Sequence, residues 1–267
     1  MKKCTPRLSP PMTILLKTPE ELAILREGGR RHAAILAELA SQVRPELSTL
    51  ILEEEALRLI KAEGDKPAFL GYQPKGARRP FPAALCVSIN DEIVHGIPNE
   101  AERIIEEGDI VSIDLGLVHR GLITDAAVTV AAGAVDDESR QLMSVARKAL
   151  ESGVAAALPG NRVGDIGFAV SAAVKSSGFS LAKDLSGHGV GYAVHEEPFV
   201  PNFGQPGKGE KLVAGMVIAI EPMVNAGSGN IKMTDDGYTI KTRDGSRSAH
   251  FEHTVAITEK GNIILTS

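Results

Sequence analysis

The spacing of apolar and polar residues divides the chain into two rounds, each with helices followed by strands. Apolar positions that recur about every 3.6 residues predict four helices, over residues 19–43, 50–63, 137–158 and 163–177. Short apolar runs predict strands over residues 84–90, 110–118, 122–130, 190–195, 216–224, 237–242, 251–257 and 262–266. Thr18 and Glu21 stand at the spacing of a capping box around Pro19, which marks the start of the first helix.

The repeated order predicts an α+β fold built from two similar halves. Its helices would cover one face of a mostly antiparallel sheet. Residues 1–12 contain three prolines and no apolar period, so we expect a flexible N-terminal tail there. Residues 13–267 are expected to form a single domain, and Met12 is a second candidate for the translation start.

Composition narrows the class of protein. A hydrophobic fraction of 43% is enough for a core, and because only 4% of residues are aromatic, aliphatic side chains must fill it. The net charge of −5 argues against a protein built to bind DNA. No apolar run is long enough to span a membrane, and the N-terminus has no secretory signal. Two cysteines form no disulfide framework, so the expected compartment is the cytoplasm.

Ionisable residues recur inside the apolar runs, where burial is costly unless something pairs with them. Four carboxylates and one imidazole form a set of donors that suits two divalent metal ions better than a structural zinc, which favours thiolates. Two bridged ions would imply an activated water molecule and hydrolysis. The five residues are Asp114, Asp125, His188, Glu221 and Glu252.

The two aspartates lie on consecutive strands joined by a short turn. A turn centred on His119 and Arg120 would place Asp114 directly opposite Asp125, with Cβ atoms about 4.5–5.5 Å apart. Two carboxylates this close repel each other, and a divalent ion would relieve the repulsion. The alternative is structural: one aspartate faces solvent and the other caps a turn.

The surroundings of Glu221 and of several histidines are unusual. Pro222 directly after Glu221 cannot donate a ladder hydrogen bond, so the strand should break there. His188 stands between two glycines, which would leave its ring accessible, and His95 and His195 could move protons or hold a substrate.

Two further histidines flank Glu252 in the sequence. In a regular strand His250 and His253 would point to the opposite face from Glu252. Alternatively, one of them would contact the metal ligands without binding the metal itself.

The stretch QPKGARRPFP at residues 73–82 predicts an exposed basic loop. Its cations, Lys75, Arg78 and Arg79, could contact the phosphates of ribosomal RNA. Three charges are weak support for that contact, and a solvated loop is the simpler interpretation.

Six segments together resemble one family. VSINDEIVHGIPN, GDIVSIDLG, ITDAA, GHGVGYAVHEEP, GMVIAIEPM and FEHTVAIT stand in the order and spacing of type I methionine aminopeptidases, in peptidase family M24. The resemblance covers residues 14–266. It implies the pita-bread fold, in which two pseudo-symmetric halves place helices outside a curved antiparallel sheet. It also implies removal of the N-terminal methionine from nascent proteins with a small second residue.

The resemblance assigns roles to individual residues. It implies two divalent metals, either Co, Mn, Fe(II) or Zn, with the five ligands named above and with the carboxylates of Asp114 and Glu252 spanning both. Glu221 would shuttle a proton, His195 would bind the scissile carbonyl, and His95 would contact the substrate near its main-chain nitrogen. The methionine pocket would consist of Phe69, Tyr72, Phe81, Cys86, Val194 and Tyr238.

The resemblance also carries expectations about partners and ions. A monovalent cation is implied near the strand that contains Asn90, with Ser248 as its side-chain ligand. The partners would be nascent polypeptide N-termini and, transiently, the ribosome exit region. Nothing in the sequence demands more than a monomer.

Some positions depart from the family pattern. Val194 and Tyr238 replace a usual aromatic residue and a usual tryptophan in the pocket, and KGARRP resembles an insertion beside it. These changes keep the pocket apolar but could alter substrate preference.

Two other functions remain open. X-Pro peptidases of the same fold usually carry a large additional N-terminal domain and a different histidine motif. A binding protein on this fold would have lost metal ligands, whereas this chain keeps all five together with His95 and His195.

Overall fold

The computed structural model describes residues 14–267, so the tail expected at residues 1–12 lies outside the described residues. The described chain forms four helices: α1 (Pro19–Gln42), α2 (Thr49–Ala62), α3 (Asp137–Ala156) and α4 (Val163–Val174). Its strands are β1 (Lys66–Pro67), β2 (Leu85–Ile89), β3 (Glu92–Val94), β4 (Ile110–His119), β5 (Leu122–Ala131), β6 (Ser180–Leu181), β7 (Ser186–Gly189), β8 (Glu196–Pro201), β9 (Val217–Ile220), β10 (Met223–Asn225), β11 (Ile231–Met233), β12 (Ile240–Thr242), β13 (Ser248–His250), β14 (Glu252–Thr258) and β15 (Gly261–Ile264).

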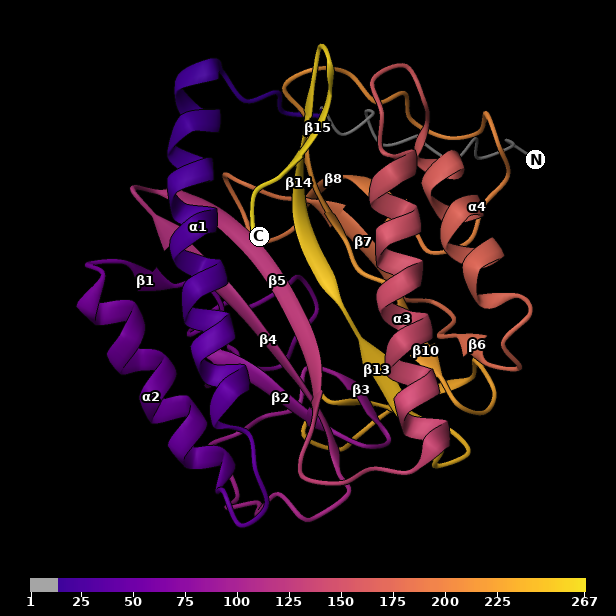
Figure 1. Cartoon of the computed structure of the whole chain (residues 1–267). Helices are drawn as coiled ribbons and strands as arrows, with labels where there is room; N and C mark the ends of the chain where they lie inside the picture. Colours follow the sequence, from indigo (N-terminus) through magenta and orange to yellow (C-terminus); the bar gives the residue numbers. More distant parts are fainter. Residues whose placement is uncertain (1–13) are drawn as a thin grey trace, which may run out of the picture.

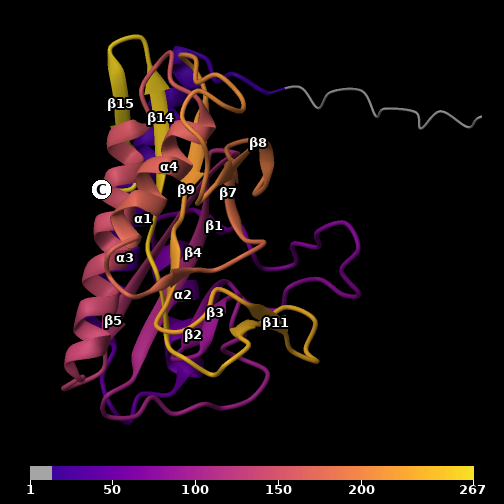
Figure 2. The ribbon, with the colours of Figure 1, turned by 90° about the vertical axis from the view of Figure 1, so that its right-hand side faces the viewer.

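The helices cover one face of an antiparallel sheet, as the sequence predicts (Figures 1 and 2). The main sheet has nine strands, with the order β1-β4-β5-β14-β9-β7-β8, and β2 and β15 pair with β4 and β14. Helices α1 and α2 lie over the strands of the first half, and α3 and α4 lie over those of the second half. The central pairing of β5 with β14 joins the two halves into one sheet.

The first helix begins as its capping box predicts. The Thr18 hydroxyl accepts a hydrogen bond from the Glu21 amide at 3.2 Å, and the Glu21 carboxylate accepts one from the Thr18 amide at 2.8 Å. The helix continues through Gly28 and Gly29, and their lack of side chains permits close packing of α1 against the neighbouring chain. A Cβ atom at Gly29 would lie 2.2 Å from the carbonyl oxygen of Leu265. The two glycines therefore let α1 approach the sheet closely.

Most of the interior is aliphatic, as the low aromatic content predicts. One cluster packs α3 and α4 against the second half of the sheet, and another packs α1 and α2 against the first half. None of the helices within residues 14–267 combines the length and the apolar character needed to cross a bilayer.

The predicted strand at residues 190–195 is wrong, because the chain bends there between β7 and β8. Gly191 takes a φ of 138°, and the Glu196 carboxylate accepts hydrogen bonds from the amides of Tyr192 and Ala193. A side chain thus satisfies backbone donors that a neighbouring strand would otherwise bind.

The β4–β5 hairpin has a different register from the predicted one. Its turn is centred on Arg120 and Gly121, whose φ angles of 50° and 86° are both positive, as in a two-residue type I′ turn. Asp114 consequently pairs with Ala127, and Gly116 pairs with Asp125. The two aspartates share one face as diagonal neighbours and are not directly opposite each other.

Candidate active site

A row of side chains crosses the sheet on one face. The ladder pairs Cys86 with Asp114, Asp114 with Ala127, and Ala127 with Glu252, so strands β2, β4, β5 and β14 contribute in turn. Asp125 lies two positions from Ala127 along β5 and therefore points to the same face. The sheet register alone thus gathers three carboxylates.

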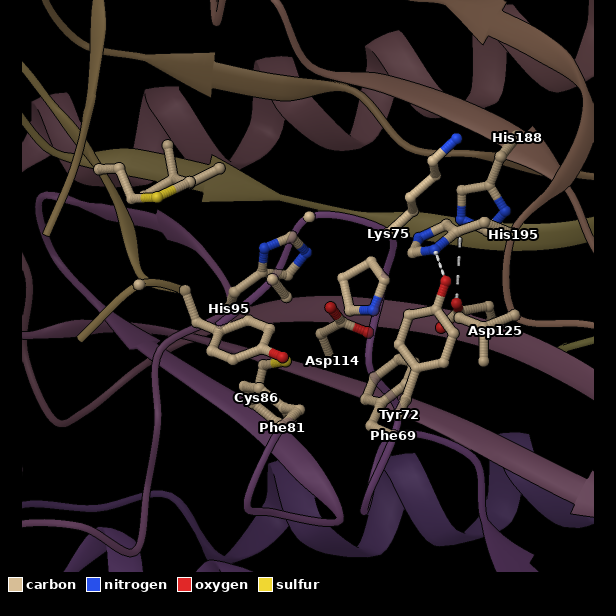
Figure 3. A pocket seen from close by; sticks show the side chains of 18 of the residues that line it. Phe69, Tyr72, Lys75, Phe81, Cys86, His95, Asp114, Asp125, His188 and His195 are labelled. Atoms are coloured by element: carbon tan, nitrogen blue, oxygen red, sulfur yellow. Dashed lines mark hydrogen bonds and ion pairs between the residues drawn. The ribbon is translucent and has the colours of Figure 1, made fainter. Parts of the chain in front are cut away.

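Glu221 and His188 complete this cluster from the second half of the chain. His253 pairs with Ile220 at the end of β9, and the ladder stops at Pro222, as predicted. The His188 Nε2 atom lies 4.0 Å from Asp125 Oδ2 (Figure 3). It lies 3.4 Å from Glu221 Oε1.

The carboxylates are buried together without a cationic side chain. Burial is the main cause that raises the pKa of Asp114 to about 7, and it raises the pKa values of Asp125, Glu221 and Glu252 well above their ordinary range. Mutual repulsion adds to the effect at the last three. Within residues 14–267, their only ion-pair contacts are to histidines.

Several of these groups also lack hydrogen-bond partners. Asp114 Oδ1, Asp125 Oδ1 and Glu252 Oε1 are buried and unpaired within the described part of the chain. Ligand atoms of Asp125, His188 and Glu252 lie within 4.8 Å of one another. Oxygen donors with one imidazole, buried and uncompensated, fit divalent metal ions.

The surroundings of His188 keep its imidazole neutral, as a metal ligand requires. Its Nδ1 atom lies 2.9 Å from the carbonyl oxygen of Gly189, to which it can donate a proton. This hydrogen bond leaves the lone pair of Nε2 facing Glu221 and Asp125. Burial lowers the pKa of His188 to about 3, which keeps the ring neutral.

His250 belongs to the cluster: the predicted placement on the opposite face from Glu252 is wrong, and the predicted alternative, a position beside the candidate metal ligands, is the one observed. Its Nε2 atom lies 3.7 Å from Glu221 Oε2 and 3.9 Å from Glu252 Oε2. His250 is two residues before Glu252, a spacing that returns a strand side chain to the same face and could have revealed it. His253 does point away, with its Nδ1 atom 3.1 Å from the Thr266 hydroxyl.

His195 lies at the end of the bend between β7 and β8. Its ring centroid is 4.4 Å from that of His188, and its Nδ1 atom is 2.7 Å from the Tyr72 hydroxyl (Figure 3). Burial lowers the pKa of His195, so its ring is neutral near pH 7.

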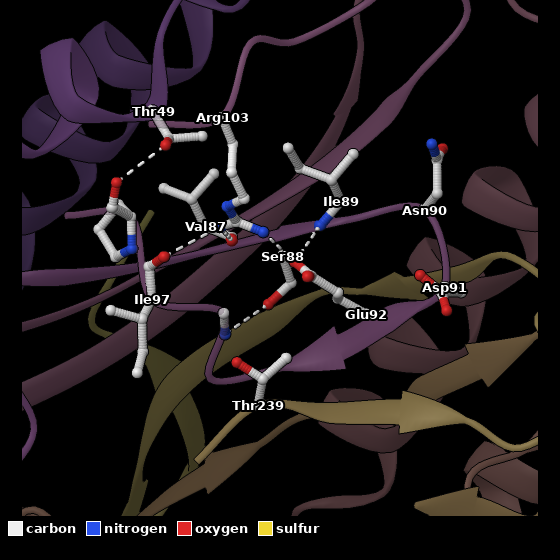
Figure 4. Close-up of polar contacts among 12 residues, drawn as sticks. Thr49, Val87, Ser88, Ile89, Asn90, Asp91, Glu92, Ile97, Arg103 and Thr239 are labelled. Carbon is white, nitrogen blue, oxygen red and sulfur yellow. Dashed lines mark hydrogen bonds and ion pairs between the residues drawn. The ribbon is translucent and has the colours of Figure 1, made fainter. Parts of the chain in front are cut away.

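His95 directly follows β3, and Figure 4 shows the polar contacts of the neighbouring residues Ser88, Glu92 and Arg103. The φ of 61° at His95 is unusual for a residue other than glycine. The Gly96 amide donates to the Ser88 hydroxyl at 3.0 Å, and the Arg103 guanidinium, paired with Glu92 at 2.6 Å, donates to nearby carbonyl oxygens. Burial, with a smaller contribution from His195, lowers the pKa of His95 to about 4.

Apolar walls adjoin the ionisable cluster in a cavity of about 540 Å³. Phe81 packs edge-on against both Phe69 and Tyr238, at centroid distances of 6.5 and 5.2 Å. The cavity brings together every residue proposed above as a metal ligand, catalytic group or pocket residue: Phe69, Tyr72, Phe81, Cys86, His95, Asp114, Asp125, His188, Val194, His195, Glu221, Tyr238 and Glu252.

Other residues also line this cavity: the family resemblance placed the KGARRP stretch beside the pocket, whereas the sequence reasoning missed the residues around β11. Lys75 and Arg78 reach it from the loop between β1 and β2, and Met233 and Asp235 reach it from the end of β11 and the turn that follows. No local motif marks the residues around β11, because their place depends on how the loops fold over the sheet.

The sequence pattern of metallopeptidase family M24 matches residues 23–259. The chain belongs to this family. Among its relatives in M24, a methionine aminopeptidase of Aquifex aeolicus is 46% identical over 259 residues, covering 96% of this chain and 99% of the relative. Methionine aminopeptidase 1 of Bacillus subtilis is 44% identical over 253 residues, covering 95% of this chain and 99% of the relative.

Solved M24 structures share the fold. The chain superposes on the methionine aminopeptidase of Thermotoga maritima with a TM-score of 0.91 at 42% identity, covering 96% of this chain and all of the other. The prolidase of Pyrococcus furiosus gives a TM-score of 0.73 at 23% identity, with 94% of this chain and 65% of the prolidase covered, a likeness of fold alone. These matches confirm the pita-bread fold expected for an M24 chain.

Proposed function

We propose that this chain removes the N-terminal methionine from peptides and nascent proteins whose second residue is small. The observation that carries the proposal is the cluster of four buried carboxylates and one neutral histidine beside an apolar cavity. Kinship with methionine aminopeptidases along nearly the whole chain supports it.

Asp114, Asp125, His188, Glu221 and Glu252 would hold two divalent ions, and Co, Mn, Fe(II) or Zn would suit these donors. When bound, the ions would supply positive charge that lowers the pKa of a water molecule toward neutrality. Asp114 and Glu252 lie in one row across the sheet on either side of Ala127 and would be among the residues that hold the ions.

The remaining polar groups would handle the peptide. If the Tyr72 hydroxyl donates to His195 Nδ1, the proton of this neutral ring lies on Nε2, which can then donate to the carbonyl oxygen as charge develops there. Glu221, whose Oε1 atom lies 3.4 Å from His188 Nε2, would accept a proton and pass it to the leaving amine. His95, held by its turn, would bind near the main-chain nitrogen of the substrate.

The apolar walls would receive the methionine side chain. Phe69, Phe81 and Tyr238 form an aromatic wall, and Cys86 and Val194 add smaller apolar surface. A flexible thioether packs well against such surfaces. The second residue of the substrate would have to be small because the ionisable cluster closes around the scissile bond.

Finer features belong to the same proposal. We place the enzyme in the cytoplasm as a monomer in which residues 13–267 act as one catalytic domain, with nascent chains reached at the ribosome exit. A monovalent cation would lie beside Asn90 and Ser248. The Ser248 hydroxyl donates a hydrogen bond of 2.9 Å to Asn225, and the lone pairs of its oxygen would bind the cation.

The test is release of free methionine by metal-stripped protein after Co, Mn, Fe(II) or Zn is added back. Met-Ala-Ser should be cleaved, and Met-Lys-Ser should resist. Glu221→Gln should abolish cleavage, whereas Glu259→Gln, the same change at an exposed turn, should not. Cleavage of an Ala-Pro peptide instead would assign the chain to X-Pro peptidases, and folded protein inactive with every metal would favour the binding-protein alternative.

A further inference from the structure

The loop between β1 and β2 forms part of the cavity wall. Figure 2 shows this purple segment and the segment around β11 projecting from the face of the sheet opposite the helices. The exposed side chains of Lys75 and Arg78 line the same cavity as His195 and the carboxylate cluster, and Lys75 appears in the close-up of Figure 3. Two cations therefore border the space that a substrate must enter.

The loop is anchored by hydrogen bonds. At its base the Phe81 amide donates to Tyr72 at 2.8 Å and the Gly71 amide donates to Phe81 at 2.9 Å. At its tip the Gln73 side chain donates to the carbonyl oxygen of Ala77 at 3.0 Å. These contacts hold the loop from which the side chains of Lys75 and Arg78 extend.

Arg79 has a different task from its neighbours. Its guanidinium pairs with Glu100 and donates to the carbonyl oxygen of Asp236. The carbonyl oxygen of Arg79 accepts a hydrogen bond from the Tyr238 hydroxyl. Arg79 thus ties the loop to the opposite wall. Within residues 14–267, it is the one cation of this loop that forms an ion pair with a carboxylate.

The charges that face the entrance are unequal. Outside the ionisable cluster, the cavity lining within the described residues carries Lys75 and Arg78 against the single exposed carboxylate of Asp235. The entrance thus carries one net positive charge, while the molecule as a whole carries a net charge of −5. A local positive charge on an acidic protein selects and steers anionic ligands.

We propose that Lys75 and Arg78 bind carboxylates of the substrate beyond its second residue and so favour substrates that are acidic downstream of the cleaved bond. The proposal rests on the proposed function, because it takes the cleaved bond to lie at the ionisable cluster. With the first two residues held inside, each further residue extends the chain by about 3.3–3.6 Å toward the entrance. The carboxylate belongs either to an acidic side chain or to the C-terminus of a short peptide.

The experiment compares kcat/KM for three amidated peptides, Met-Ala-Asp-Glu-Ser, Met-Ala-Ser-Ser-Ser and Met-Ala-Lys-Lys-Ser, using metal-loaded full-length protein. An exposed charge pair changes affinity by about 1.4- to 5-fold, so the acidic peptide should exceed the basic one by several-fold. The ratio should shrink toward one in 1 M salt, where the screening length is about 3 Å. Met-Ala-Ser as free acid and as amide distinguishes a C-terminal carboxylate from acidic side chains.

Charge variants show whether the two cations cause the preference. The acid-to-base ratio should fall toward one in K75S/R78S and invert in K75E/R78E. It should persist in K208S/K211S, which removes the same charge from an exposed loop between β8 and β9. Thermal unfolding of each variant shows that it is folded.

The outcomes separate this inference from the proposed function. Equal cleavage of all three peptides by active protein overturns the inference alone. A preference that survives in K75S/R78S also overturns it. No cleavage of any Met-Ala peptide overturns the proposed function itself. If K75S/R78S leaves the peptide ratio unchanged and weakens only sedimentation with ribosomes, the loop binds RNA and the inference is wrong.

Discussion

Raising the pH should destabilise the metal-free protein in a window set by the carboxylate cluster. The pKa of Asp114 is raised to about 7, and those of Asp125, Glu221 and Glu252 are raised well above their ordinary range. A raised pKa in the folded state means that folding favours the protonated form. The stabilisation is complete below the unfolded pKa and is lost as pH rises through the folded pKa.

The magnitude follows from the number of protons retained. Each carboxylate that stays protonated only in the folded state lowers the free energy of unfolding by about 1.4 kcal/mol per pH unit. Above pH 7, one retained proton would lower Tm by about 3–6 °C per pH unit in a domain of this size. Additional retained protons would steepen the slope in proportion.

Buried histidines act in the opposite direction at lower pH. Burial lowers the pKa values of His32, His188 and His250 to about 3, so stability is lost as pH falls below their unfolded value of 6.5. Between about pH 4, where unfolded carboxyl groups ionise, and pH 6.5 the two effects therefore oppose each other, and only above pH 6.5 does the carboxylate effect act alone. The carboxylate effect is measured cleanly between pH 7 and 8.5.

The assay is equilibrium unfolding between pH 7 and 8.5 with chelator, and again with saturating Mn(II) or Co(II). Metal should flatten the slope because it replaces the protons on its ligands, and it should raise stability by about 2.7 kcal/mol at a hundred times its Kd. Asp125→Asn should reduce the metal-free slope, and Glu259→Gln should preserve it. Metal-free stability that does not change over this range would refute the reasoning.

Three further changes test how the site is supported. Lys17 Nζ lies 2.5 Å from Glu196 Oε2, and Lys17→Met would leave the buried Glu196 carboxylate without this partner. The free energy of unfolding in urea should fall by about 3–5 kcal/mol, whereas the exposed change Lys260→Met should lower it little. Gly29→Ala forces a methyl group against the Leu265 carbonyl, and a loss of less than about 1 kcal/mol would contradict the close packing. Arg103→Met should lower kcat/KM at unchanged metal affinity measured by calorimetry, and unaltered kinetics would show that the turn needs no such support.

Local sequence determined much of the architecture. The capping box at Thr18 and Glu21 places the start of α1, because a cap needs only residues within one helical turn. The break between β9 and β10, at Glu221 and Pro222, follows from Pro222, which lacks an amide proton wherever it stands. The motifs also carried a family resemblance, and that resemblance named metal ligands and pocket residues that line the cavity.

Tertiary structure decided how those segments meet. The positive φ angles at Arg120 and Gly121 shift the hairpin so that Asp114 and Asp125 become diagonal neighbours, and a shift of register changes every cross-strand contact. The pairing of His250 in β13 with Met223 in β10, in a separate small sheet, holds His250 beside the carboxylates. Lys75 reaches the cavity because a loop folds over the sheet, and contacts between residues far apart in the chain leave no periodic trace in the sequence.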